Sequence, residues 1–253
     1  MLQCRCRYRC DAQVGQALKA YELKKFAQGE NMKTVELIAP CHFGMEAVLK
    51  REIQDLGYEI SEVENGKVTF VGDMEAICYA NIFLRTAERI LLKVGRVHAE
   101  TFDELFEKTK ALPWEDFIPR DGKFWVAKAT SIRSKLFSPS DIQSIMKKAM
   151  VERLKTVYHQ EWFEESGASY PVRVFFMKDE AVIGLDTSGD SLHKRGYRLL
   201  TSRAPITETL ASALILMTPW NRRSFLRQRR NTDRGGDDRR EHRSGHEPQL
   251  SGK

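Results

Sequence analysis

Strand-like and helix-like segments alternate along the chain from Met32 to Asn221, and this alternation stops at Arg222. Apolar residues at every second position, or short runs of branched and aromatic residues, predict strands over 33–39, 58–64, 66–71, 90–97, 124–131, 172–178 and 181–186. Apolar residues at helical spacing predict helices over 43–56, 74–84, 101–112, 138–158 and 205–217. Mixed strands and helices joined by short loops indicate a layered α/β or α+β fold.

Several of these segments end in residues that favour a defined turn or cap. Asn65-Gly66 lies between two expected strands and predicts a hairpin turn. Asp73 predicts the N-cap of helix 74–84. Ser138, followed by a proline and then by Asp141, resembles a capping box at the start of helix 138–158. These signals fix where we expect the segments to begin.

The formal charge of +6 is distributed unevenly along the 253 residues. Residues 222–253 contain nine arginines and one lysine against five acids, and residues 1–31 contain six bases against three acids. The two ends therefore carry +5 and +3, which leaves −2 for residues 32–221. A basic protein often binds nucleic acid, but here the excess charge belongs to the ends. Any nucleic-acid binding by residues 32–221 must come from a local patch.

Composition and the chain start indicate a cytoplasmic protein. No run of about 18 apolar residues occurs, so we expect no membrane span. The first ten residues lack the apolar core of a secretory signal. Cys4, Cys6 and Cys10 lack the paired spacing of zinc ligands, and the five cysteines do not form a disulfide framework. We therefore expect a reducing compartment and no metal.

The sequence contains none of the common catalytic motifs, such as a nucleophile elbow, a zinc-binding HExxH, a phosphate-binding loop or a dinucleotide-binding glycine pattern. His42, His98, His159 and His193 are scattered and have no nucleophile at a matching spacing. We therefore expect no catalytic residue and no cofactor-binding residue in the chain as written.

A basic stretch around the start of helix 138–158 is the best candidate for contact with RNA. A helix N-terminus presents free N–H groups that favour phosphate, and cations near it would follow an RNA backbone. The expected RNA-binding residues are Lys128, Arg133, Lys135, Ser138, Lys147, Lys148 and Lys155. An ordinary solvated helix face would have the same composition and remains an alternative.

Four motifs resemble a known family: ENGKVTFVGD, LRTAERILLKVG, LDTSGDSLHKRGYR and APITETLASALI. They resemble the N-terminal half of bacterial THUMP-domain RNA methyltransferases, which are similar to the enzymes that methylate guanine N2 in large-subunit ribosomal RNA. The resemblance runs from Met32 to Asn221. It implies a ferredoxin-like subdomain, expected over 32–64, and an RNA-binding THUMP domain, expected over 65–187. Residues 188–221 would be a linker and the first helix of a Rossmann-like methyltransferase domain that uses S-adenosylmethionine.

Residues 222–253 do not continue the family pattern, in which a cofactor-binding motif DPFCGSGT should follow. Read one base over, the codons of Arg223 to Arg229 permit DPFCGSG, and the codons up to Leu250 permit further family-like sequence. We interpret this as a frameshift near residues 221–223, which would make 222–253 a disordered tail. A genuine arginine-rich tail that binds RNA is the alternative. Residues 1–31 are expected to be a non-native leader, because residues 28–31 can be encoded by a ribosome-binding sequence.

Three hypotheses about the function remain open. The first is an RNA-binding module that lacks the catalytic domain, binds no cofactor itself and contacts ribosomal rather than transfer RNA. The second is a complete S-adenosylmethionine-dependent enzyme, if the reading frame is restored. The third is a ferredoxin-like protein-interaction module without any RNA role.

Overall fold

The computed structural model describes residues 34–196 and 206–218. The strands are β1 (Val35–Pro40), β2 (Glu59–Glu64), β3 (Lys67–Gly72), β4 (Leu91–His98), β5 (Lys123–Ile132), β6 (Ser169–Met177) and β7 (Glu180–Asp186). The helices are α2 (Glu46–Asp55), α3 (Met74–Phe83), α4 (Phe102–Lys110), the short 3₁₀ helix η1 (Trp114–Asp116), α5 (Pro139–Tyr158) and α6 (Glu208–Met217). Every expected strand and helix is present, with ends that differ by at most three residues, and the expected mixed α/β fold is confirmed.

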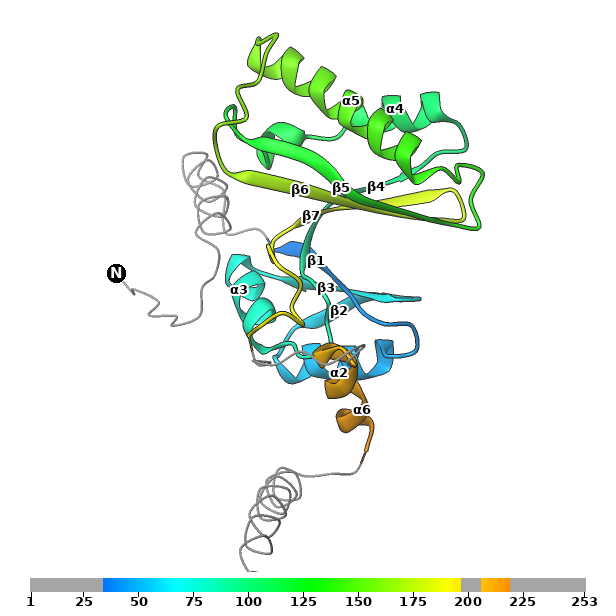
Figure 1. Cartoon of the computed structure of the whole chain (residues 1–253), viewed down its shortest axis with the longest axis vertical. Coiled ribbons are helices and arrows are strands. Elements are labelled where there is room, and N and C mark those ends of the chain that lie inside the picture. The colour runs from blue at the N-terminus through cyan, green and yellow to red at the C-terminus, as the bar shows by residue number, and fades with distance from the viewer. Residues whose placement is uncertain (1–33, 197–205, 219–253) are drawn as a thin grey trace, which may run out of the picture. The chain divides into compact units, whose positions relative to one another are not determined.

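The first half of the sheet has a ferredoxin-like arrangement. Its elements follow one another as β1, α2, β2, β3, α3 and β4, and the strands lie side by side in the order β4-β1-β3-β2, all antiparallel. Helices α2 and α3 belong to this half (Figure 1). The β2–β3 hairpin therefore belongs to this first lobe, with β2 at the outer edge of the sheet. The boundary expected after residue 64 would fall at the turn of this hairpin.

The second half extends the same sheet through β4 in the order β4-β7-β6-β5. β4 pairs with β7 along its whole length but shares only two residue pairs with β1. The sheet is therefore continuous between the two halves only through this short β1–β4 pairing. β5 runs parallel to β6 and forms the edge of the sheet, while the other neighbours are antiparallel. Helices α4 and α5 cover one face of this half (Figure 1).

Local sequence explains where several elements begin. The Asp73 carboxylate accepts a hydrogen bond of 2.7 Å from the Ala76 N–H, which confirms the expected N-cap of α3. Ser138 is the N-cap residue of α5, but the expected capping box is absent. The Ser138 hydroxyl lies 3.1 Å from the Ser140 hydroxyl and does not accept from the helix backbone. The proline at the first helical position therefore favours the helix start without that side-chain bond.

A single hydrophobic core runs under the helices of both halves. It includes Leu37 and Phe70 from the first half and Phe124, Met146 and Phe176 from the second. A much smaller cluster on the other face of the sheet joins Ile38, Leu91 and Val182, with Phe175 packed against it. The face of the sheet that no helix covers is therefore apolar only around this small cluster.

The one described element that the sequence did not predict is the 3₁₀ turn η1. Trp114 is fully buried there, and its indole N–H donates a hydrogen bond of 2.8 Å to the Thr109 carbonyl. Tyr158 at the end of α5 donates to the Ile118 carbonyl at 2.6 Å, so this segment is attached to α5. A three-residue turn has too few residues to show a helical period.

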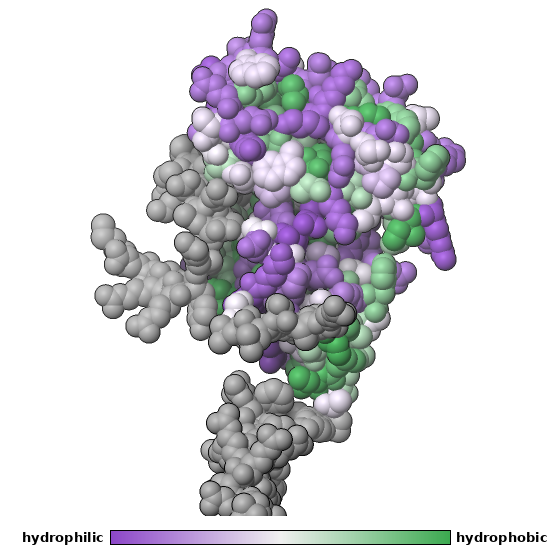
Figure 2. Space-filling view, viewed as in Figure 1, coloured by the Kyte–Doolittle hydropathy of each residue, from purple (hydrophilic) through white to green (hydrophobic). Residues whose placement is uncertain are grey.

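Helix α6 confirms the expected helix over 205–217 with a start three residues later. Thr209 and Ala213 are buried, whereas Leu214 and Met217 are exposed and Leu210 is half-buried. Figure 2 shows apolar side chains gathered on this helix. Exposed apolar side chains of this kind favour association.

The expectations for residues 1–31 and 222–253 lie outside the described residues. Within 34–196 and 206–218, no helix combines the length and apolarity that a bilayer crossing requires.

Candidate nucleic-acid interface

The seven expected RNA-binding residues occupy three separate places in the fold. Lys128 lies on the edge strand β5, and Arg133 follows the end of that strand. Lys135 and Ser138 lie in the loop that leads into α5. Lys147, Lys148 and Lys155 lie on α5 itself. The structure therefore does not gather all seven into one patch.

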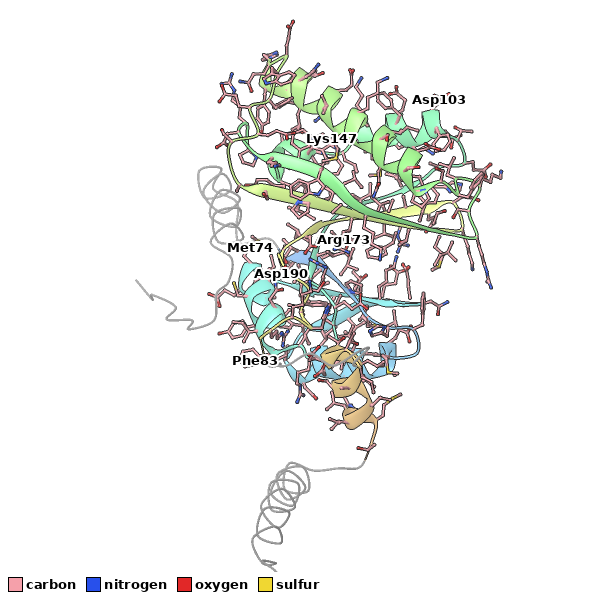
Figure 3. All side chains as sticks on the ribbon, viewed as in Figure 1. Met74, Phe83, Asp103, Lys147, Arg173 and Asp190 are labelled. Atoms are coloured by element: carbon pink, nitrogen blue, oxygen red, sulfur yellow. The ribbon has the colours of Figure 1, made fainter. Side chains whose placement is uncertain are left out.

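Lys147 is occupied by contacts within the protein. Its ammonium group donates to the Phe124 carbonyl and forms an ion pair of 2.9 Å with Glu165. It also lies 3.8 Å from the centroid of the Phe124 ring. Figure 3 shows Lys147 on the side of α5 that faces the sheet. A phosphate would have to displace these contacts, so Lys147 is a poor RNA ligand.

Lys135 also has an acidic partner. Its ammonium group donates to the Glu100 carboxylate, and this bond raises the pKa of the Lys135 side chain. Its backbone N–H donates at 2.7 Å to the Asp179 carboxylate. Lys135 therefore connects the loop before α5 to the β6–β7 turn.

Four of the seven residues are exposed cations without an ion-pair partner among the described residues. Lys128, Arg133, Lys148 and Lys155 are exposed and form no ion pair with any described residue. Arg153, which we did not include, pairs with Glu115 at 2.5 Å. The free cations fall into two groups, one at the end of β5 and one along α5.

The first group lies on the helix-free face of the second half. Phe124, Val126 and Ala129 of β5 are buried toward the helices. A β-bulge between Val126 and Lys128 shifts the alternation of side chains by one residue, so Trp125, Lys128 and Ile132 all point to the opposite face. The sequence analysis included Lys128 as a candidate but not Trp125. The signal for Trp125 was an aromatic residue at the outward position between the apolar residues Phe124 and Val126. This face offers an aromatic ring and a cation along one strand.

A cavity lies at the end of this face. Its volume is about 260 Å³, and its lining residues are Phe43, Asn65, Ile132, Arg133, Met177 and Lys178. Phe43 and Asn65 come from the first lobe, and the others come from the ends of β5 and β6. Sequence reasoning missed Phe43, Asn65 and Lys178 because only the fold brings them next to Arg133.

The motif LDTSGDSLHKRGYR builds the connection between the lobes. Asp186 is 2% exposed in its side chain and accepts from Arg89 at 2.7 Å and from Arg173 at 2.9 Å. Arg89 also donates to the Gly189 carbonyl and to the Ser191 hydroxyl. Arg173 lies at the junction of the lobes in Figure 3. The Asp186 carboxylate on β7 thus contacts both Arg173 of β6 and Arg89, which lies in the segment between α3 and β4.

The same motif closes the end of α3. The Arg195 guanidinium donates to the Asn81 carbonyl at 2.9 Å and to the Leu84 carbonyl at 2.6 Å. These carbonyls have no partner within a helix that ends there, and a cation near a helix C-terminus is favourable. The described part of this motif therefore has a structural role.

Nucleophilic chemistry finds little support in the described residues. Burial raises the pKa of the Cys41 thiol to about 12, so it remains protonated at neutral pH. His42 contacts Glu88 at 3.4 Å and Thr207 at 3.4 Å, next to α6. No group of three metal-binding side chains occurs in the part of the chain that the structure describes.

Each of the two lobes matches a known family of its own. The family described as "RlmL ferredoxin-like domain" matches residues 36–91, and the family described as "THUMP domain" matches residues 99–186. The chain is a THUMP-domain protein. The ferredoxin-like domain includes the β2–β3 hairpin, in agreement with the sheet topology, and the THUMP domain includes the helix-free face with Lys128.

Relatives extend the match across both domains. "Putative RNA methyltransferase YpsC" of Bacillus subtilis is 53% identical over 191 residues, which are 75% of this chain and 49% of the relative. "Ribosomal RNA large subunit methyltransferase K/L" of Ectopseudomonas mendocina is 30% identical over 191 residues, 74% of this chain and 26% of the relative. The crystal structure of SMU.472, "a putative methyltransferase complexed with SAH", matches with a TM-score of 0.65 and 41% identity, covering 74% of this chain and 50% of that one. The THUMP-domain protein thus spans about half the length of the Bacillus subtilis relative and about a quarter of the K/L enzyme.

Proposed function

We propose that the ferredoxin-like and THUMP domains of this chain bind RNA as the target-recognition half of an S-adenosylmethionine-dependent methyltransferase of ribosomal RNA. The observation that carries the proposal is the helix-free face of the THUMP domain, where Lys128 and Arg133 are exposed and form no ion pair with a described residue. The relatives named as RNA methyltransferases support RNA as the partner. We place the main contact at the end of β5 and a second contact at Lys148 and Lys155 of α5.

The family resemblance implies that the reaction is methylation of guanine at N2. It requires a domain that holds S-adenosylmethionine after α6, and residues 222–253 as written lack the glycine turn of that domain. We infer that these residues are encoded one base out of frame, since the shifted codons permit DPFCGSG. The DNA sequence of codons 218–225 tests this inference. Codons that cannot spell the motif would leave a genuine arginine-rich tail.

Charge reversal on α5 separates an RNA contact from an internal ion pair. We expect Lys148→Glu to weaken RNA binding without changing the unfolding midpoint, and to lower the salt slope of binding by about 1. We expect Lys147→Glu to lower the unfolding midpoint instead, because it places a second carboxylate beside Glu165. Fluorescence anisotropy with RNA and thermal denaturation of both variants measure the two effects. Equal loss of RNA affinity in both variants with unchanged stability would contradict this assignment.

Equilibrium binding tests the proposed function as a whole. We expect the chain to bind fragments of large-subunit ribosomal RNA more tightly than transfer RNA, with affinity that falls steeply as salt rises. A ferredoxin-like protein-interaction module without an RNA role would show no RNA affinity that depends on Lys128 and Arg133. Such a result would favour the hypothesis of a protein-interaction module.

A further inference from the structure

The cavity between Phe43 and the ends of β5 and β6 has the features of a nucleotide site. Phe43 is 69% exposed, although it is a large apolar residue. Its ring nevertheless has a firm support, because a Cβ atom on Gly66 would lie 3.0 Å from it. The Cys41 N–H donates to the Gly66 carbonyl at 2.9 Å, and the Gly66 N–H donates to the Glu46 carboxylate at 2.7 Å. A flat aromatic surface is thus held open at the cavity wall.

Two cations border the same cavity. Arg133 and Lys178 line it, are exposed, and form no ion pair with a described residue. Asp179, the acidic neighbour of Lys178, is occupied because its carboxylate accepts from the Lys135 N–H. The cations are therefore available to an anion outside the protein.

Hydrogen bonds join the two backbone segments that carry these cations. Lys178 and Asp179 form the two-residue turn of the β6–β7 hairpin, and their φ angles of 52° and 63° are those that such a turn favours. Arg133, which follows β5, has a φ angle of 52°. The Lys178 N–H donates to the Ile132 carbonyl at 3.3 Å, and the Asp179 N–H donates to the Ser134 hydroxyl at 3.1 Å. These hydrogen bonds hold the segment around Arg133 next to Lys178.

We propose that this cavity receives one unpaired nucleotide of an RNA. The base stacks on Phe43 between Ile132 and Met177, and its flanking phosphates lie beside Arg133 and Lys178. A volume of about 260 Å³ is below the range of about 300–1,000 Å³ typical of sites for larger ligands, and suits a single base. Unpaired bases stacked on aromatic side chains, with cations on the backbone, are a common form of RNA recognition.

This proposal rests on the proposed RNA-binding function, but the experiment separates the two. The full chain is titrated with a fluorescent RNA hairpin that has a single-stranded 3′ extension, and with the same hairpin without the extension. We expect Phe43→Ala to weaken binding of the extended hairpin by about ten-fold, since a stacked base contributes about 1–3 kcal/mol. Binding of the blunt hairpin should stay unchanged.

Matched variants control for folding and for aromatic character. Phe43→Trp retains a stacking surface, so we expect the affinity of the extended hairpin to return to within about two-fold of wild type. Phe83→Ala removes another exposed aromatic residue, on α3 (Figure 3), and should change neither affinity. Arg133→Gln should weaken the extended hairpin without altering the unfolding midpoint, even if Phe43→Ala proves less stable. Replacement of a uridine in the extension by 5-iodouridine should direct a photochemical cross-link to Phe43.

The outcomes are distinct. If the wild-type chain binds RNA but Phe43→Ala binds the extended hairpin as wild type does, or the cross-link forms elsewhere, the nucleotide site is wrong and the RNA-binding function stands. If the wild-type chain binds neither hairpin, both proposals are wrong.

Discussion

Replacing Asp186 by alanine is expected to lower the free energy of unfolding by about 3 kcal/mol. The Asp186 carboxylate is buried and accepts from both Arg89 and Arg173, whose side chains are 15% and 20% exposed. Removing one member of a buried ion pair leaves its partners uncompensated, which costs about 3–5 kcal/mol, and the partial exposure of the arginines favours the lower value. For a protein of this size the loss corresponds to a fall of roughly 6–12 °C in melting temperature.

Thermal and urea denaturation of the Asp186→Ala variant measure this effect. Glu180→Ala is the matched control, because Glu180 lies on the same strand and pairs with Arg96 at 3.6 Å while half its side chain is exposed. Exposed pairs contribute about 0–1 kcal/mol, so the control should melt close to wild type. Similar melting of the two variants would show that Asp186 does not join the lobes as described.

Replacing Trp114 by alanine is expected to destabilise the THUMP domain by about 3–5 kcal/mol, the usual range for a fully buried large aromatic residue. The loss includes the hydrogen bond from the indole N–H to the Thr109 carbonyl. Trp162→Ala offers the same chemical change at a side chain that is 81% exposed, and it should shift stability by no more than about 0.5 kcal/mol. Urea denaturation compares the two variants. Equal stabilities would mean that η1 is not part of the core.

The sequence predicted those features that depend on neighbouring residues. Strand alternation, helical spacing and the Asp73 cap are encoded within a few positions, and the structure confirms them. The parallel pairing of β5 with β6 depends on the fold of the chain between them, so the helix-free face was not predicted. The same reason explains the missed ion pairs of Lys135 with Glu100 and of Lys147 with Glu165, which lie 35 and 18 residues apart.

The candidate site was predicted only in part for the same physical reason. A list of cations can be read from the sequence, but whether each cation is free depends on acids that the fold brings close. Lys128 and Arg133 remain free of ion pairs among the described residues, whereas Lys147 does not. Phe43 carries no signal of its own, since its position beside Arg133 arises only when the ferredoxin-like lobe joins the THUMP sheet.

The salt dependence of RNA binding tests the central claim most directly. The full chain is compared with a variant in which Lys128, Arg133 and Lys148 are replaced by glutamine, and the affinity for large-subunit ribosomal RNA is measured over a range of salt concentrations. Each lost phosphate contact should lower the slope of log affinity against log salt by about 1, so we expect a slope shallower by about 3. An unchanged slope and affinity would show that the described domains do not provide the RNA-binding surface.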